Sequence, residues 1–146
     1  MRKFALASVL MMATLAPSRA QAVTLGLDLG GGVWLVPLTP QFDFHFKVQF
    51  ALGKVVSFGL RPGILLNVSP AIQVGVPFDV YFRFHVSRLY FDLMGGLALL
   101  FGDAQFLRAH GAVGMGVFIA KGFAIGFEGG YLQNGAQLLA RFSFNF

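Results

Sequence analysis

Apolar residues alternate with small or polar residues along almost the whole chain after residue 22. Residues 42–51, for example, read FDFHFKVQFA, in which the even positions are all apolar up to Phe50. A period of two places alternate side chains on opposite faces of a β-strand. After residue 22 no apolar run approaches the roughly 18 residues that indicate a membrane helix. We therefore expect an all-β protein.

Eight segments carry this alternation. We expect strands over residues 23–30, 42–51, 56–61, 78–86, 89–97, 108–119, 123–128 and 137–146. A membrane-spanning strand needs about 9–11 residues, and most of these segments approach that length. The pattern predicts an up-and-down antiparallel sheet that closes on itself.

The predicted connections alternate in length. Gly53-Lys54, Ser87-Arg88 and Ala120-Lys121-Gly122 indicate tight turns, each with one cation. The connections over 34–40, 67–75, 102–107 and 132–136 are expected to be longer. Short turns on one side and longer loops on the other are typical of outer-membrane barrels, whose short turns are periplasmic.

Two prolines interrupt the strand pattern. Pro62 and Pro77 each lack a backbone N–H and cannot donate to a β-ladder. We interpret them as strand ends or bulges that bound the second longer loop.

The composition distinguishes a barrel embedded in lipid from a β-sheet protein surrounded by water. Hydrophobic residues make up 56% of the 146 residues and charged residues only 12%, against roughly 25% charged in an ordinary soluble domain. The alternative is a soluble β-sandwich, whose second face would carry many solvated charges. Here that face carries mostly Gly, Ala and Ser. Every charged residue that we place within a strand also falls on this face. Arg or Lys facing lipid at the bilayer centre costs roughly 2–4 kcal/mol, so a barrel with charges inside and lipid outside explains the pattern better.

The composition also excludes several kinds of site. The chain has no cysteine, so it has no disulfide, thiolate metal site or lipidated cysteine. Its net charge of +5 falls to +2 if Arg2, Lys3 and Arg19 are removed with a leader. No basic patch with interleaved aromatic residues is then left, and we expect no nucleic-acid partner.

Residues 1–22 resemble an export signal. Met1-Arg2-Lys3 is a basic start, Phe4 to Ala16 is an apolar run, and Ala20-Gln21-Ala22 is a small-x-small cleavage pattern. The alternative is a membrane anchor, but a spanning helix needs about 20 apolar residues. We expect cleavage after residue 22 and a barrel domain over 23–146.

The chain resembles small bacterial outer-membrane barrels of the OmpA/OmpX type. The resemblance rests on strand number, side-chain parity and the ending RFSFNF over residues 141–146. In this class, a terminal phenylalanine with alternating aromatics before it is read by the barrel-assembly machinery. The resemblance implies that Phe142, Phe144 and Phe146 are an assembly signal, and that the partners are outer-membrane lipid and this machinery. It implies a bacterial outer-membrane location and a chain that we expect to be monomeric.

Seven charged residues are predicted to point inward at similar depth and to form a lumen charge cluster. They are Asp28, Lys47, Arg61, Arg83, Asp92, Glu128 and Arg141. Closure would place Arg141 between the strands of Asp28 and Glu128, and a guanidinium can serve two carboxylates. The favoured interpretation is a packed, salt-bridged, non-enzymatic lumen. The alternative is a narrow pore for ions or very small solutes, because rings of charge set selectivity.

The remaining candidates carry weaker signals. His45, His85 and His110 have no metal-ligand spacing, so we expect no metal site and no cofactor. His85-Val86-Ser87 resembles the His-x-Ser pair of an eight-stranded lipid A deacylase family, which leaves a lipid-modifying enzyme as a further alternative. Trp34 is expected to contact lipid as an interfacial anchor.

Overall fold

The computed structural model describes residues 23–35, 38–68, 72–102, 105–132 and 135–146. Within these residues the chain forms eight antiparallel strands that close into one barrel. The strands are β1 (Val23–Leu35), β2 (Leu38–Ala51), β3 (Val56–Val68), β4 (Ile72–Val86), β5 (Leu89–Phe101), β6 (Leu107–Ala120), β7 (Phe123–Leu132) and β8 (Gly135–Asn145).

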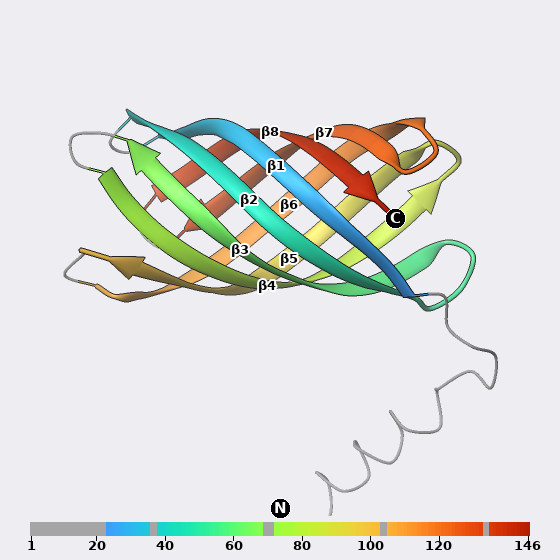
Figure 1. The fold of residues 1–146 in the computed structure, drawn as a ribbon, viewed down its shortest axis with the longest axis horizontal. Coiled ribbons are helices and arrows are strands. Elements are labelled where there is room, and N and C mark those ends of the chain that lie inside the picture. The colour runs from blue at the N-terminus through green and yellow to red at the C-terminus, as the bar shows by residue number, and fades with distance from the viewer. Residues whose placement is uncertain (1–22, 36–37, 69–71, 103–104, 133–134) are drawn as a thin grey trace, which may run out of the picture.

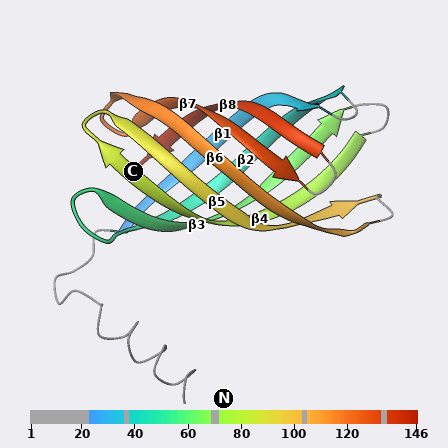
Figure 2. The same cartoon turned by 180° about the vertical axis from the view of Figure 1, so that it is seen from behind.

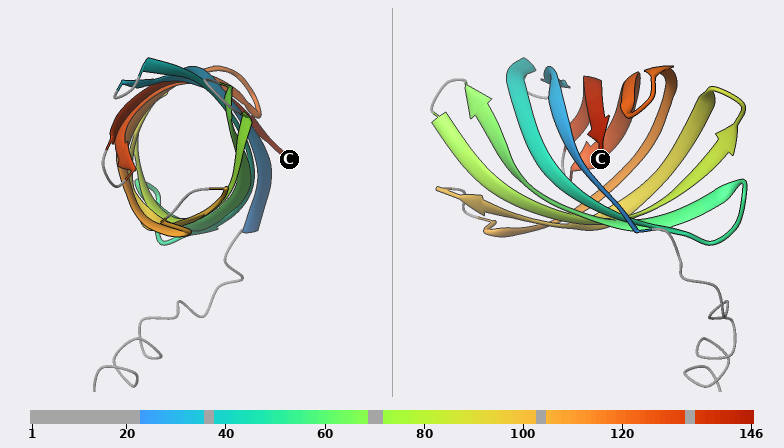
Figure 3. Two further views of the ribbon diagram at one scale, coloured as in Figure 1. Left: turned by 90° about the vertical axis from the view of Figure 1, so that its left-hand side faces the viewer. Right: turned by 45° about the vertical axis from the view of Figure 1, so that its right-hand side comes forward.

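Each strand pairs with its neighbours in the sequence, and β8 returns to pair with β1. The closing ladder runs from Gly26 opposite Asn145 to Trp34 opposite Gln137. Figure 1 shows the strands tilted across the barrel axis, and the end-on view in Figure 3 shows the closed ring. Closure pairs the backbone of every strand on both sides, as a hydrocarbon environment requires. The predicted fold class is therefore confirmed.

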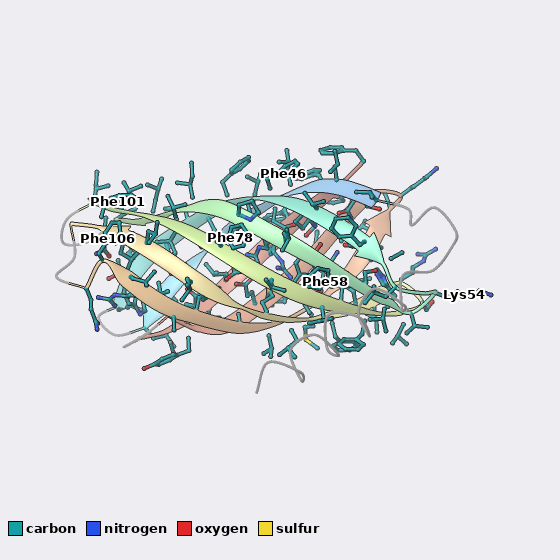
Figure 4. All side chains as sticks on the ribbon, turned by 90° about the horizontal axis from the view of Figure 1, so that it is seen from below. Phe46, Lys54, Phe58, Phe78, Phe101 and Phe106 are labelled. Carbon is teal, nitrogen blue, oxygen red and sulfur yellow. The ribbon has the colours of Figure 1, made fainter. Side chains whose placement is uncertain are left out.

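The two faces of the wall have opposite chemistry. Every charged side chain that the structure places within a strand is buried inside the barrel. The large apolar side chains point outward, and Phe42, Phe127 and Leu93 remain more than half exposed. Figure 4 shows side chains projecting from the outside of the ribbon along the length of the barrel. A continuous apolar exterior of this kind is stable only against lipid.

The strands are longer than the alternation predicted. β1 and β3, for example, extend to Leu35 and Val68 instead of ending near residues 30 and 61. The interpretation of Pro62 and Pro77 as strand ends was wrong, because both lie inside strands. The pairs between β3 and β4 stop after Pro62–Phe78 and resume in the same register at Leu65–Gly75. The sheet therefore tolerates the missing proline donors by leaving out ladder pairs locally.

The two ends of the barrel differ less in connection length than predicted. Residues 52–55, 87–88 and 121–122 connect strands at one end, here called the turn end, and both Val23 and Phe146 lie there (Figure 1, right). Residues 36–37, 69–71, 102–106 and 133–134 connect strands at the opposite end, the loop end. The prediction of clearly longer connections at the loop end was wrong because the strands continue into those segments.

The expected export signal over residues 1–22 lies outside the described residues and stays a prediction. Among the residues that the structure does describe, none belongs to a helix that is long and apolar enough to cross a membrane.

Candidate functional site

The lumen charge cluster is built from seven strands. Each of β1, β2, β3, β4, β5, β7 and β8 contributes one of its members, in the order Asp28, Lys47, Arg61, Arg83, Asp92, Glu128 and Arg141. All seven side chains are buried. The remaining strand, β6, contributes Gly114, where an added Cβ would lie 2.8 Å from Nη2 of Arg141. The absence of a side chain at this position leaves space for the guanidinium.

Arg141 is the member with the most carboxylate partners. Its Nη2 donates to Oδ2 of Asp92 at 2.7 Å, and its Nη1 donates to Oε2 of Glu128 at 3.0 Å. Asp28 lies farther away, at 3.8 Å from Nη1. The sequence analysis expected Glu128 and Asp28 as partners, whereas the structure makes Asp92 a closer partner than Asp28.

The two other guanidiniums share these carboxylates. Arg83 binds Asp92 with a two-bond fork, at 2.7 and 2.8 Å. Arg61 donates to the same Oε2 of Glu128 at 2.9 Å, and its Nε lies 3.6 Å from Asp28. Asp92 and Glu128 are thus each held between two arginines. Such sharing is favourable in a buried site because each carboxylate has more than one cationic partner.

Asp28 is held by a different set of groups. Nζ of Lys47 lies 2.8 Å from its Oδ1, and the hydroxyl of Ser143 donates to the same oxygen at 2.6 Å. Ser143 was not predicted as part of the site. Its inward parity on β8, two residues from Arg141, is the signal that could have identified it.

A second hydrogen-bonded group crosses the lumen between the charge cluster and the loop end. This polar chain consists of Gln41, Asp43, Asp79, His110 and Gln137. The imidazole of His110 contacts Asp79 through Nδ1 and Gln137 through Nε2, both at 2.6 Å. Gln41 donates to Gln137 and to Asp43, both at 3.1 Å. The parity of the predicted strands over 42–51 and 78–86 places Asp43 and Asp79 on the inward face, but the sequence analysis did not predict that these five residues meet.

Trp34 is not an interfacial anchor. Its side chain is only 7% exposed and lies in an apolar cluster with Leu65, Ala98, Leu100 and Leu132 inside the barrel. The guanidinium of Arg108 lies 5.5 Å from the indole ring centre. The prediction failed because β1 continues past residue 30, so that Trp34 keeps the inward parity of Asp28.

Aromatic side chains fill the half of the lumen nearer the turn end. The Tyr81 hydroxyl donates to Gln49 at 3.1 Å, and its ring occupies the space where Gly59 has no side chain. The Arg83 guanidinium lies 4.1 Å from the ring centre of Tyr90, within cation–π range. The described inward side chains therefore change in kind along the lumen, from the apolar cluster at Trp34, through the polar chain and the charge cluster, to the aromatic rings of Tyr81 and Tyr90.

Each of the three histidines contacts a polar side chain, and the serine that contacts His85 is not the one that the His-x-Ser resemblance implied. Nδ1 of His45 lies 3.2 Å from Arg61. The serine hydroxyl that contacts His85 is that of Ser57, at 3.2 Å, whereas Ser87 lies in the turn with a φ of 57°. Across the described part of the chain, no group of three or more His, Asp or Glu side chains could hold a metal ion.

Comparisons with solved structures identify the same fold. A designed transmembrane β-barrel matches 84% of this chain and 95% of its own, with a TM-score of 0.67 and 14% identity. The designed barrel TMB2.3 matches 83% and 92%, with a TM-score of 0.58 and 15% identity. The N-terminal β-barrel domain of Pseudomonas aeruginosa OprF matches 84% and 97%, with a TM-score of 0.55 and 14% identity.

No protein-family model and no curated protein matches the sequence. At these identities the structural matches establish the architecture alone. The chain has the fold of small eight-stranded transmembrane barrels, as its side-chain parity indicated.

Proposed function

We propose that this chain is a non-enzymatic outer-membrane barrel whose lumen is sealed by packed, salt-bridged side chains. The observation that carries the proposal is the lumen charge cluster, which joins seven of the eight strands through buried contacts. Several of these contacts, at 2.7–3.0 Å, are too short for water to enter between the groups. A sealed lumen would make the barrel a structural component of the membrane rather than a conduit.

The proposed location is the bacterial outer membrane, reached after cleavage of residues 1–22. Both ends of the described chain lie at the turn end, which we assign to the periplasmic side from which the chain would be inserted. We expect Phe142, Phe144 and Phe146 to be read by the barrel-assembly machinery. A monomer is supported by closure, since each strand edge is paired within a single chain.

Single-channel recording in planar bilayers tests the sealed lumen. The protein is expressed from its full-length sequence, extracted from outer membranes in detergent, and checked for folding by its heat-modifiable migration on gels. We expect no discrete conductance steps. A bilayer that stays silent after insertion of this protein should still show steps when a known porin is added, which verifies the recording.

Discrete steps would contradict the proposal and favour the narrow pore. In that case Arg141→Met and Asp28→Asn should change the conductance or the ion selectivity, because both residues lie in the charge cluster. Steps that neither substitution changes would place conduction outside the cluster, and the cluster would then be unrelated to conduction.

A further inference from the structure

The outer surface has a recess over β5, β6 and β7. These strands lie at the front in Figure 2. Three outward-facing glycines gather there, with Gly95 paired to Gly111, and Gly129 paired to Val113. A Cβ added at Gly111 or Gly129 would meet no atom within 4 Å. Elsewhere large apolar side chains cover the outer wall, so this region is recessed relative to its surroundings.

Two cavities extend from this recess toward the turn end. One, of about 280 Å³, is lined by Phe91, Val113, Gly114, Met115, Phe127 and Gly129. The next, of about 250 Å³, shares Phe91, Met115 and Phe127 with the first and reaches Leu89 and Ile125. Together they form a continuous groove, here called the lipid groove. Its lining is apolar, which suits a hydrocarbon chain.

A third cavity, of about 310 Å³, lies at the turn end of the same strands. Arg88 and Lys121 line it together with Phe118, Ile119, Ala120 and Gly122. Arg88 directly precedes Leu89 of the lipid groove, and the Arg88 carbonyl accepts a hydrogen bond from the Phe118 amide at 2.8 Å. Two adjacent hairpin turns thus hold two cations at the end of an apolar groove.

We propose that the lipid groove and its cationic end bind one anionic glycerophospholipid. Its phosphate contacts Arg88 and Lys121, and one acyl chain lies along Phe91, Met115 and Phe127. The inference rests on the proposed membrane location, which supplies the lipid, and on the turn end facing a phospholipid leaflet.

Charge complementarity selects a lipid over a second copy of the chain. The side-chain carboxylates of the described residues are Asp28, Asp43, Asp79, Asp92 and Glu128, and all are buried in the lumen. The described outer wall of another copy therefore has no side-chain carboxylate to place opposite Arg88 and Lys121. A lipid phosphate supplies the charge, and its acyl chain supplies the apolar surface.

Native mass spectrometry of the full-length-expressed protein, purified in detergent, tests the site. The protein is titrated with phosphatidylglycerol and, separately, with phosphatidylethanolamine. We expect tighter binding of phosphatidylglycerol. Arg88→Gln and Lys121→Gln should each weaken that binding by about fivefold, the effect of roughly one cation near an anionic membrane surface. Both residues are exposed in turns, so we expect the two variants to fold like the unmodified protein.

Lys54→Gln is the matched control for charge. Lys54 is also a turn-end cation, but its side chain extends away from the barrel (Figure 4). We expect its phosphatidylglycerol affinity to equal that of the unmodified protein. An equal loss in the Lys54, Arg88 and Lys121 variants would mean nonspecific attraction and would overturn the proposal, as would equal affinity for the two lipids.

Filling the groove provides a second, independent arm. Gly129→Leu places a side chain in open space within the groove and should reduce phosphatidylglycerol binding at least as much as loss of one cation. Gly31→Leu is its control, because Gly31 is an outward glycine on β1 whose added Cβ would make an ordinary 3.8 Å contact with Phe42. Unchanged binding in Gly129→Leu would refute the groove as the acyl-chain site.

The mass spectra also identify other occupants of the groove, and the conductance recording tests the sealed lumen separately. A lipid-free dimer that is present in the unmodified protein and absent in Gly129→Leu would identify the groove as a contact between copies. That result would overturn the lipid assignment. Lipopolysaccharide carried through purification in place of phosphatidylglycerol would also overturn it, since the site would then face the other leaflet. Failure of the sealed lumen appears instead as conductance steps, with lipid binding unchanged.

Discussion

Replacing Arg141 with methionine tests whether the lumen charge cluster stabilises the barrel. Arg141 is 2% exposed and contacts Asp92 and Glu128 at 2.7 and 3.0 Å. Methionine keeps much of the side-chain length without the charge, so the change removes two charge-assisted hydrogen bonds and leaves little empty volume.

The magnitude follows from what remains around the two carboxylates. Removing one partner of a buried ion pair costs about 3–5 kcal/mol, because the other charge is left uncompensated. Here Arg83 still binds Asp92, and Arg61 still binds Glu128. The loss should therefore lie near the lower limit, at about 3 kcal/mol of unfolding free energy.

A second substitution separates charge from packing. Arg141→Met combined with Glu128→Gln removes one cation and one carboxylate, so the charge balance of the lumen is unchanged. We expect the double variant to recover about 1 kcal/mol or more relative to the sum of the two single losses, as expected for coupled residues.

Urea unfolding in detergent micelles or lipid vesicles measures these differences. Trp34 is the only tryptophan and is buried in the lumen, so its fluorescence reports loss of the barrel interior. Midpoints are compared at equal slope, because a changed slope would indicate a different unfolded state. A loss below about 0.5 kcal/mol for Arg141→Met, or strict additivity in the double variant, would refute the reasoning.

Three further predictions concern packing, the lumen and assembly. Gly59→Ala should destabilise the barrel by about 1–3 kcal/mol in the same urea assay, because the new Cβ would lie 2.5 Å from the Tyr81 ring. Gly129→Ala is the control and should be nearly neutral, because its new Cβ would lie in open space. Equal losses of stability in the two variants would contradict this account. Trp34 emission should be quenched weakly by brominated acyl chains and by aqueous iodide, whereas strong quenching by the lipid would restore the interfacial position. Phe146 is 74% exposed, and its amide donates a hydrogen bond to the Leu25 carbonyl at 2.8 Å. Deleting Phe146 should lower outer-membrane assembly in cells more than it lowers refolding in detergent. Equal effects on both would argue against an assembly signal.

The fold was accessible from the sequence because the signal is local. A strand places residues i and i+2 on one face, and the lipid outside tolerates apolar side chains but not charges. Alternation such as that of residues 42–51 therefore reveals both the secondary structure and the side of the wall that each residue occupies.

Strand length was harder to predict because glycine and proline are ambiguous. The first strand was expected to end at residue 30, where three consecutive glycines begin, yet β1 continues to Leu35 with Gly30, Gly31 and Gly32 all paired to β2. Ladder partners on both sides hold the backbone extended even where the local preference is weak. The wrong position of Trp34 followed directly from the misjudged strand end.

The sequence by itself determined the eight-stranded architecture and the inward direction of the charges, since both depend on side-chain parity within a strand. Only the tertiary structure decided which inward groups touch. Asp92 and Arg141 are 49 positions apart, yet their atoms lie 2.7 Å from each other across the lumen. Their meeting depends on strand tilt and on the stagger with which β8 closes against β1, and these arise from the pairing of all eight strands together. The groove over β5 to β7 likewise becomes visible only when glycines from separate strands are placed side by side.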